Sequence, residues 1–207
     1  MNRKKRDILK PTRILFLIVL LAANTFAWFI YATKVDNHIS VHVKAWNVVF
    51  EAGENQVTNN INLTVDDLYP GMEDYSYEIK AYNRGEVSAT LSYKILSARI
   101  LNEEYITVDG RAELNQQAQA GDLTSQQLEN KLLNDYPFSI AMAISNTYMQ
   151  LGNGEESFTF DVTWPYESQN DELDTTWGIN AAEYKEDHPQ SSSISIQVKL
   201  IITQNAN

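Results

Sequence analysis

The stretch ISIQVKLIIT, residues 194–203, decides the fold class of this chain of 207 residues. Apolar side chains stand at every even position from Ile194 to Ile202, and the odd positions between them are polar except Ile201. Successive side chains of a strand point to opposite faces of the sheet. The stretch therefore predicts a strand with one buried face and one face toward water.

The same period of two recurs along most of the chain. We expect further strands at residues 38–50, 57–65, 75–83, 87–95, 138–144 and 158–164. In the first of these, the apolar positions change from odd to even between Ala45 and Asn47. One extra residue exchanges the two faces of a strand, so this change predicts a β-bulge or a bend.

Three turn signals lie between the expected strands. Pro70-Gly71 predicts a type II turn, with glycine at the position that needs a positive φ. Asn83-Arg84-Gly85-Glu86 predicts a hairpin that joins the strands 75–83 and 87–95. Asp109-Gly110 predicts another hairpin.

Two segments favour helices. Thr124 and Gln127 fit a capping box at the start of a helix over about 123–135, with Leu128, Leu132 and Leu133 on its apolar face. A second short helix is expected over about 175–186. The predicted fold is mainly β, a jelly-roll-like or β-sandwich domain with short helical insertions.

The N-terminal segment, residues 1–33, has the order of a signal peptide or a signal-anchor. Six basic residues precede an uncharged run from Ile14 to Ala32, whose nineteen residues match the thickness of a bilayer. Basic residues before the run predict that residues 34–207 form a domain outside the cell. The run either spans the lipid bilayer uncleaved or is cut by a signal peptidase near its end, where small residues fit the subsites: Ala23, Thr25 and Ala27.

The expected outer domain is strongly acidic. Six of the 16 basic residues and one of the 27 acidic residues lie in 1–33, so residues 34–207 carry a formal charge of −16. Such a surface makes nucleic acid and anionic lipid poor partners. The chain has no cysteine, so a packed core rather than disulfides must stabilise it. Cysteine-free exported domains are common in Gram-positive bacteria.

Three stretches resemble the TasA/camelysin family of exported biofilm matrix proteins. They are the end of the apolar run, residues 23–29; the stretch VFEAG, residues 49–53; and the stretch from Leu68-Tyr69-Pro70-Gly71-Met72 to the Asn83-Arg84-Gly85 turn. The resemblance covers roughly residues 20–95. It implies a secreted fibre subunit or accessory that associates with itself or with another matrix protein, after a signal peptidase has released it.

The strand nearest the membrane run is the expected donor in such an assembly. Ile39, Val41 and Val43 alternate with polar residues and follow the run almost directly. A segment freed from about Trp28 to Val49 would add as a strand to a groove of the next subunit. The alternative is a single-pass anchored extracellular binding domain, in which the same strand only begins the sandwich.

Four acidic residues form the candidate metal site. Glu167, Asp171, Glu172 and Asp174 offer oxygen ligands for Ca²⁺, which would support calcium-dependent adhesion. The competing interpretation is a solvated loop in which Asp174 or Thr175 caps the following helix. No other cofactor is expected.

Catalytic patterns are missing from the sequence, so we expect no enzyme. His38 and His42 lie about 13 Å apart in a strand, too far to share a metal ion. The zinc motif His-Glu-x-x-His is absent, as is a thiol nucleophile. The aromatic residues Trp46, Tyr75, Tyr77, Tyr82 and Tyr93 form either a binding stripe or, as we favour, cross-strand packing.

Overall fold

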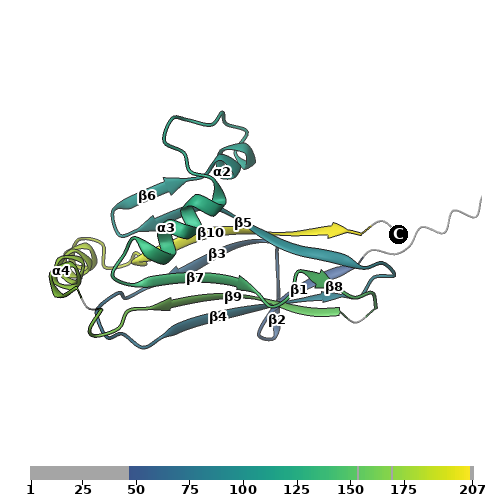
Figure 1. The fold of residues 1–207 in the computed structure, drawn as a ribbon, viewed down its shortest axis with the longest axis horizontal. Coiled ribbons are helices and arrows are strands. Elements are labelled where there is room, and N and C mark those ends of the chain that lie inside the picture. The colour runs from purple at the N-terminus through teal and green to yellow at the C-terminus, as the bar shows by residue number, and fades with distance from the viewer. Residues whose placement is uncertain (1–46, 153, 169, 206–207) are drawn as a thin grey trace, which may run out of the picture. The chain divides into compact units, whose positions relative to one another are not determined.

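The strands form two antiparallel sheets in a sandwich-like arrangement (Figure 1). The computed structural model describes residues 47–152, 154–168 and 170–205, all within one compact unit, Lys44–Asn207. The first sheet has the order β2 (Asn55–Val57), β1 (Val48–Ala52), β4 (Tyr75–Asn83), β9 (Gly154–Thr163) and β7 (Ser139–Ile144). The second has the order β3 (Asn60–Val65), β10 (Ile194–Gln204), β5 (Ala89–Ile100) and β6 (Glu103–Ile106), with β8 (Tyr148–Met149) also paired to β5. The helices are α2 (Val108–Glu113), α3 (Ser125–Asn134) and α4 (Asp171–Asp187).

The alternating stretch at the C-terminus forms a central strand, β10, as predicted. It pairs with β5 along its whole length, from Ile194 opposite Ile100 to Gln204 opposite Ala89. Ile194, Ile196, Val198 and Leu200 are at most 1% exposed. Full burial of such a side chain contributes about 1.5–3 kcal/mol, so this face of β10 adds substantially to the stabilisation by the core.

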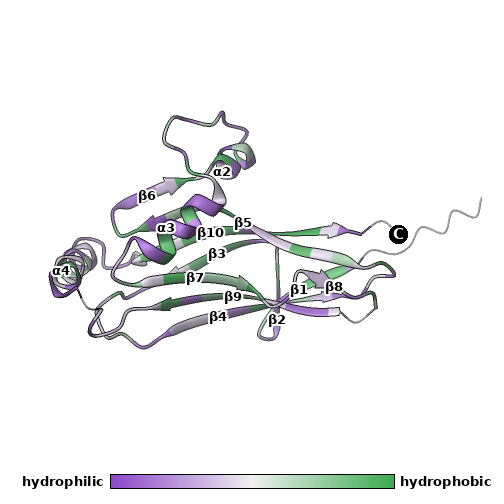
Figure 2. Cartoon of the chain, in the orientation of Figure 1, coloured by the Kyte–Doolittle hydropathy of each residue, from purple (hydrophilic) through white to green (hydrophobic). Residues whose placement is uncertain are grey.

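The inner faces of both sheets meet in a single core, and apolar residues recur along the strands (Figure 2). From the first sheet, β9 contributes Phe158 and Phe160, both fully buried. Tyr93 of β5 meets Phe158 edge to face at 5.2 Å between ring centroids, and Tyr75 meets Phe160 at 6.0 Å. Tyr77 also packs against the core, so the aromatic residues pack as favoured, while Tyr82 lies under Arg84 and Trp46 lies outside the described residues.

Helix α3 packs against β7 and β5, and its predicted capping box is confirmed. Leu128 and Leu132 are fully buried, but Leu133 is 43% exposed, so its assignment to the apolar face was wrong. Leu128 and Leu132 lie four residues apart on one face of the helix, and this narrow face packs against the sheets.

The predicted hairpin at Asn83 to Glu86 is wrong, because β4 and β5 belong to different sheets. The chain crosses between the sheets there. The buried Asn83 side chain holds the crossing: its amide donates to the carbonyl oxygens of Val87 at 2.8 Å and Gln150 at 3.0 Å, and its oxygen accepts from the Gly85 N–H. The asparagine turn therefore carries the chain from the first sheet to the second, and it does not close a hairpin.

The expected strand 57–65 is also divided between the two sheets. β2 pairs with β1 in one sheet, and β3 pairs with β10 in the other. Between them, the hydroxyl of Thr58 donates to the carbonyl oxygen of Asn60 at 2.8 Å, which fixes the bend.

The predicted hairpin at Asp109-Gly110 is replaced by helix α2, which begins after the N-cap Thr107. Leu96 has no partner on β10, because the register shifts there, and its carbonyl oxygen accepts the Thr107 N–H at 3.0 Å. A Cβ on Gly110 would lie 2.0 Å from the same oxygen. The helix therefore sits directly on the bulge of β5, and only glycine allows this approach.

The type II turn at Pro70-Gly71 is confirmed. Gly71 has a φ of 76°, and the Met72 N–H donates to the Tyr69 carbonyl oxygen at 3.2 Å.

Among the helices of the described residues, none is long and apolar enough to cross a bilayer. The predicted membrane or signal helix within 1–33 lies outside them.

Two helix glycines offer a matched test of this packing. We expect Gly110→Ala to lower the free energy of unfolding by about 2 kcal/mol or more. The added Cβ would clash with the carbonyl oxygen of Leu96, and this backbone group cannot move aside as a side chain can. Gly178→Ala in α4 meets Pro70 only at 3.5 Å and should stabilise by up to about 1 kcal/mol through helix propensity. Urea unfolding measures both, and equal effects would contradict the close approach of Gly110.

Candidate functional site

The free part of strand β10 is the clearest candidate for an interaction site. Pairing with β3 ends where Lys199 lies opposite Asn60, and the Leu200 N–H donates to the Asn59 carbonyl oxygen at 2.8 Å. Residues 201–204 then pair with β5 on one side and, among the residues that the structure describes, have no strand on the other. Within the described ranges, this part of β10 is therefore an open edge that begins where β3 ends.

The backbone groups of this edge point alternately toward and away from β5. Since the Leu200 N–H points toward β3, the N–H and C=O of Ile202 point the same way, into the open edge. The groups of Ile201 and Thr203 point toward β5, opposite Ser92 and Thr90. Such an edge is a template for an added strand.

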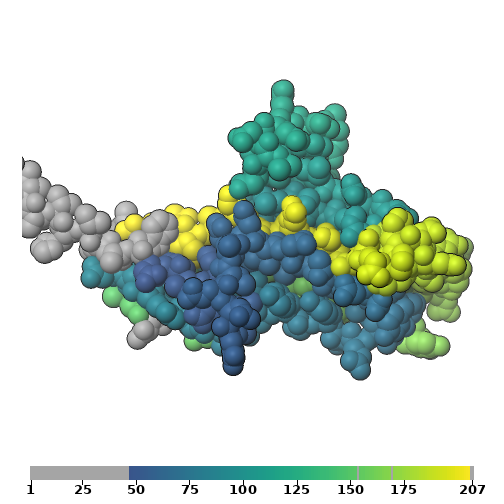
Figure 3. All heavy atoms as spheres, turned by 180° about the vertical axis from the view of Figure 1, so that it is seen from behind, coloured from purple at the N-terminus to yellow at the C-terminus, as the bar shows by residue number. Residues whose placement is uncertain are grey.

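An apolar groove of about 370 Å³ adjoins the edge. It lies between the two sheets and is lined by Val48, Phe50, Asn59, Leu200 and Ile202. In Figure 3 the last residues of β10 (yellow) lie at the surface beside the blue of the first strands. An incoming strand would find backbone partners and a place for apolar side chains together.

β3 and β7, of six residues each, are also edge strands, whereas two further edges are less suited to an added strand. β2 has three residues, and β6 has four that begin with the exposed pair Glu103 and Glu104. Short edges and edge charges both oppose pairing with another chain.

The predicted donor residues Ile39, Val41 and Val43 lie outside the described residues, as do Ala23, Thr25, Ala27, His38 and His42. One correction concerns the C-terminal limit of the donor. Val48 and Val49 belong to β1 and lie opposite Asn83 and Tyr82 of β4. A donor segment must therefore end before Val48, and the chain enters its own sheet beside the groove.

Asp174 of the predicted metal site is buried and already has hydrogen-bond partners. One carboxylate oxygen accepts from the indole Nε1 of the buried Trp164 at 2.8 Å. The other accepts from the hydroxyl of Ser168 at 2.7 Å and from its backbone N–H at 3.2 Å. Asp174 therefore ties the segment after β9 to helix α4.

The N-cap of α4 was also predicted wrongly. The helix begins at Asp171, and the cap is Asn170, whose side-chain oxygen accepts from the Leu173 N–H at 3.2 Å. Asp174 thus lies in the first turn, where its negative charge also favours the helix dipole.

The other three predicted ligands, Glu167, Asp171 and Glu172, are exposed. Within the described ranges, no three acidic or histidine side chains gather closely enough to hold a metal ion. Calcium binding stays a prediction from the sequence.

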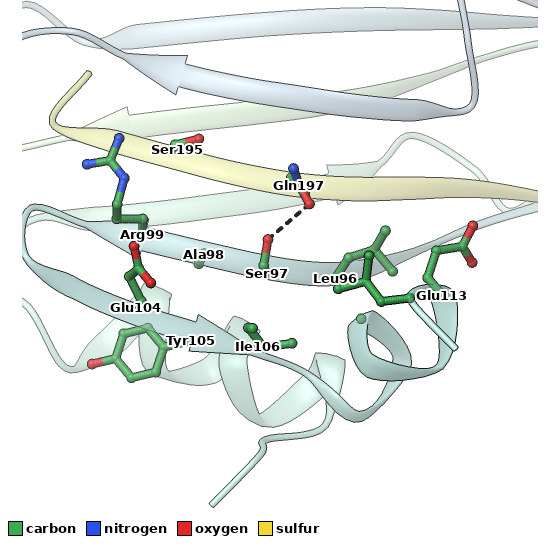
Figure 4. Close-up of a pocket in the computed structure, with 12 residues that line it drawn as sticks. Leu96, Ser97, Ala98, Arg99, Glu104, Tyr105, Ile106, Glu113, Ser195 and Gln197 are labelled. Atoms are coloured by element: carbon green, nitrogen blue, oxygen red, sulfur yellow. Dashed lines mark hydrogen bonds between the residues drawn. The ribbon is translucent and has the colours of Figure 1, made fainter. Parts of the chain in front are cut away.

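A second hollow of about 300 Å³ lies on the outer face of the β10–β5–β6 sheet, next to α2 (Figure 4). Leu96, Ile106 and Leu114 give it an apolar side, and the hydroxyl of Ser97 donates to the side-chain oxygen of Gln197 at 3.2 Å. Glu113 at its margin binds Lys199 at 2.6 Å. Several of its polar groups therefore already have partners on the same chain.

No family model, no curated protein and no solved structure matches this chain. The candidate sites therefore stand on their own geometry.

The buried carboxylate of Asp174 predicts a dependence of stability on pH. Hydrogen bonds from Ser168 and then Trp164 hold the pKa of Asp174 below its usual value of 3.8. Its contribution is therefore complete above about pH 4 and is lost as the pH falls through the lower pKa of the folded state. We expect Asp174→Asn to lower the melting temperature at pH 7, and this difference to shrink below about pH 4.

Asp171→Asn is the matched control on the same helix, since Asp171 is exposed. It should change the melting temperature little at any pH. A melting difference for Asp174→Asn that stays constant from neutral to strongly acid pH would contradict the role given to the ionised carboxylate.

Proposed function

We propose that this chain is a non-enzymatic exported protein of the cell envelope, a TasA-like matrix fibre subunit or an accessory to one. Its jelly-roll-like domain lies outside the cell, and copies assemble by strand addition. The observation that carries the proposal is the edge of β10 at 201–204, which has no partner strand on one side among the residues that the structure describes, beside the groove of Val48, Phe50 and Ile202.

The donor in this proposal is the segment of a second copy that contains Ile39, Val41 and Val43. Added beside residues 201–204, its backbone would take up the N–H and C=O of Ile202. Each hydrogen bond contributes about 0.5–1.5 kcal/mol net, and apolar side chains placed in the groove add about 25 cal/mol per Å² of buried apolar area. Alternation in the donor suits this edge, because every second side chain then faces the groove.

Two neighbouring isoleucines of β10 test the edge. Ile202 lines the groove, whereas Ile201 belongs to the opposite face of the strand, and both are half-buried. We expect Ile202→Lys to abolish assembly of residues 34–207, because an inward charge blocks a new strand. Ile201→Lys should leave assembly intact. Sedimentation velocity measures the oligomers, and assembly of both variants alike would contradict the proposal.

Removal of the donor is the complementary test. Deletion of residues 34–45 should leave a folded monomer, since β1 begins only at Val48. If that variant assembles like the parent chain, the donor lies elsewhere. N-terminal sequencing of protein recovered from cells decides the topology: a start at Met1 or Asn2 identifies a membrane-anchored domain, and a start near Trp28 identifies a secreted subunit.

A further inference from the structure

A hollow of about 530 Å³ lies beside helix α4 and has mixed chemistry. The turn after β3, the segment after β9 and one side of α4 form its walls. Its lining residues are Pro70, Tyr166, Glu167, Asp171, Asp174, Thr175, Gly178, Ile179 and Ala182.

The backbone around this hollow is firmly held. The Gly71 N–H donates to the carbonyl oxygen of Trp164 at 2.8 Å, and Trp164 is bound to Asp174 of α4. Gly71 allows the turn to approach the segment after β9 closely, because a Cβ there would lie 3.1 Å from the ring of Tyr166. A preformed site costs little ordering on binding.

The side chains that line the hollow are nevertheless exposed. Tyr166 is 79% exposed and Ile179 is 53% exposed. The carboxylates of Glu167 and Asp171 stand at the same hollow. An aromatic face and aliphatic walls next to two carboxylates suit a side chain with an apolar stem and a cationic head.

The cations of the described residues are already engaged on their own chain. Seven bind carboxylates within the same chain, namely Lys80, Arg84, Lys94, Arg111, Lys131, Lys185 and Lys199. The eighth, Arg99, donates to the carbonyl oxygens of Leu101 and Ser192 and to the hydroxyl of Tyr184. The acidic domain therefore attracts basic partners while its own described cations are committed elsewhere.

We propose that this hollow binds a lysine- or arginine-bearing segment of a different protein. The alkyl stem of the basic side chain packs on Tyr166, Pro70 and Ile179, and its charged head meets Glu167 and Asp171. The formal charge of −16 on residues 34–207 speeds the encounter. This site lies apart from the edge of β10 and does not rest on the assembly proposed above.

The test uses the full chain in neutral detergent micelles and fluorescein-labelled nona-arginine as the probe. Fluorescence anisotropy gives the affinity. We expect the double variant Glu167→Gln/Asp171→Asn to bind about tenfold more weakly, through the loss of two charge contacts. Tyr166→Ala should bind about threefold more weakly, through the loss of the aromatic face.

A matched control removes the same charge from elsewhere on α4. Glu183 and Glu186 are exposed on the helix and do not line the hollow, so Glu183→Gln/Glu186→Gln should weaken binding less than twofold. Equal weakening by the two double variants would overturn the proposal, since the probe would then report only the net charge. An unchanged affinity of Tyr166→Ala would also overturn the proposal. So would self-association of the chain that Glu167→Gln/Asp171→Asn abolishes, because the hollow would then bind a second copy and not a different protein.

Discussion

Burial of the inner face of β10 between the two sheets is the interaction on which the rest of the structure depends. The chain has no cysteine, so packing has to hold the sheets together. β10 lies between β3 and β5, and its buried residues face a core to which β9 contributes Phe158 and Phe160. Because β10 runs on to Gln204 while β3 pairs only as far as Asn60, the strand that completes the core also has an open edge in the part of the chain that the structure describes.

The sequence predicted the strands well because alternation is a local signal. β4 coincides with the predicted 75–83, and β7, β9 and β10 lie close to their predicted ranges. The hairpins predicted at Asn83 to Glu86 and at Asp109-Gly110 were wrong. Turn residues indicate that the chain bends, but they do not indicate which sheet it enters next. The bulge at Leu96 positions α2. It arises from the pairing of β5 with β10, and no local sequence signal predicts it.

The candidate site was predictable only in part. The acidic segment 167–174 was recognised, but Asp174 is a buried anchor for Trp164 and Ser168 rather than a surface ligand. A tryptophan ten residues before an aspartate at a helix start was the available signal. The edge at 201–204 could not be predicted, because it follows from the unequal lengths of β3 and β10 once they are paired. The two proposed surfaces thus use different chemistry, backbone pairing at β10 and side-chain charge beside α4.

Hydrogen exchange at single amides shows whether strands add at the edge of β10. In residues 34–207, we expect the Ile202 amide to exchange fast in the monomer and to become protected on assembly, because its N–H faces the open edge. The amides of Ile201 and Thr203, which point toward β5, should be protected in both states. Assembly that leaves the Ile202 amide as exposed as before, or protection of that amide already in the monomer, would contradict the open edge as the site of strand addition.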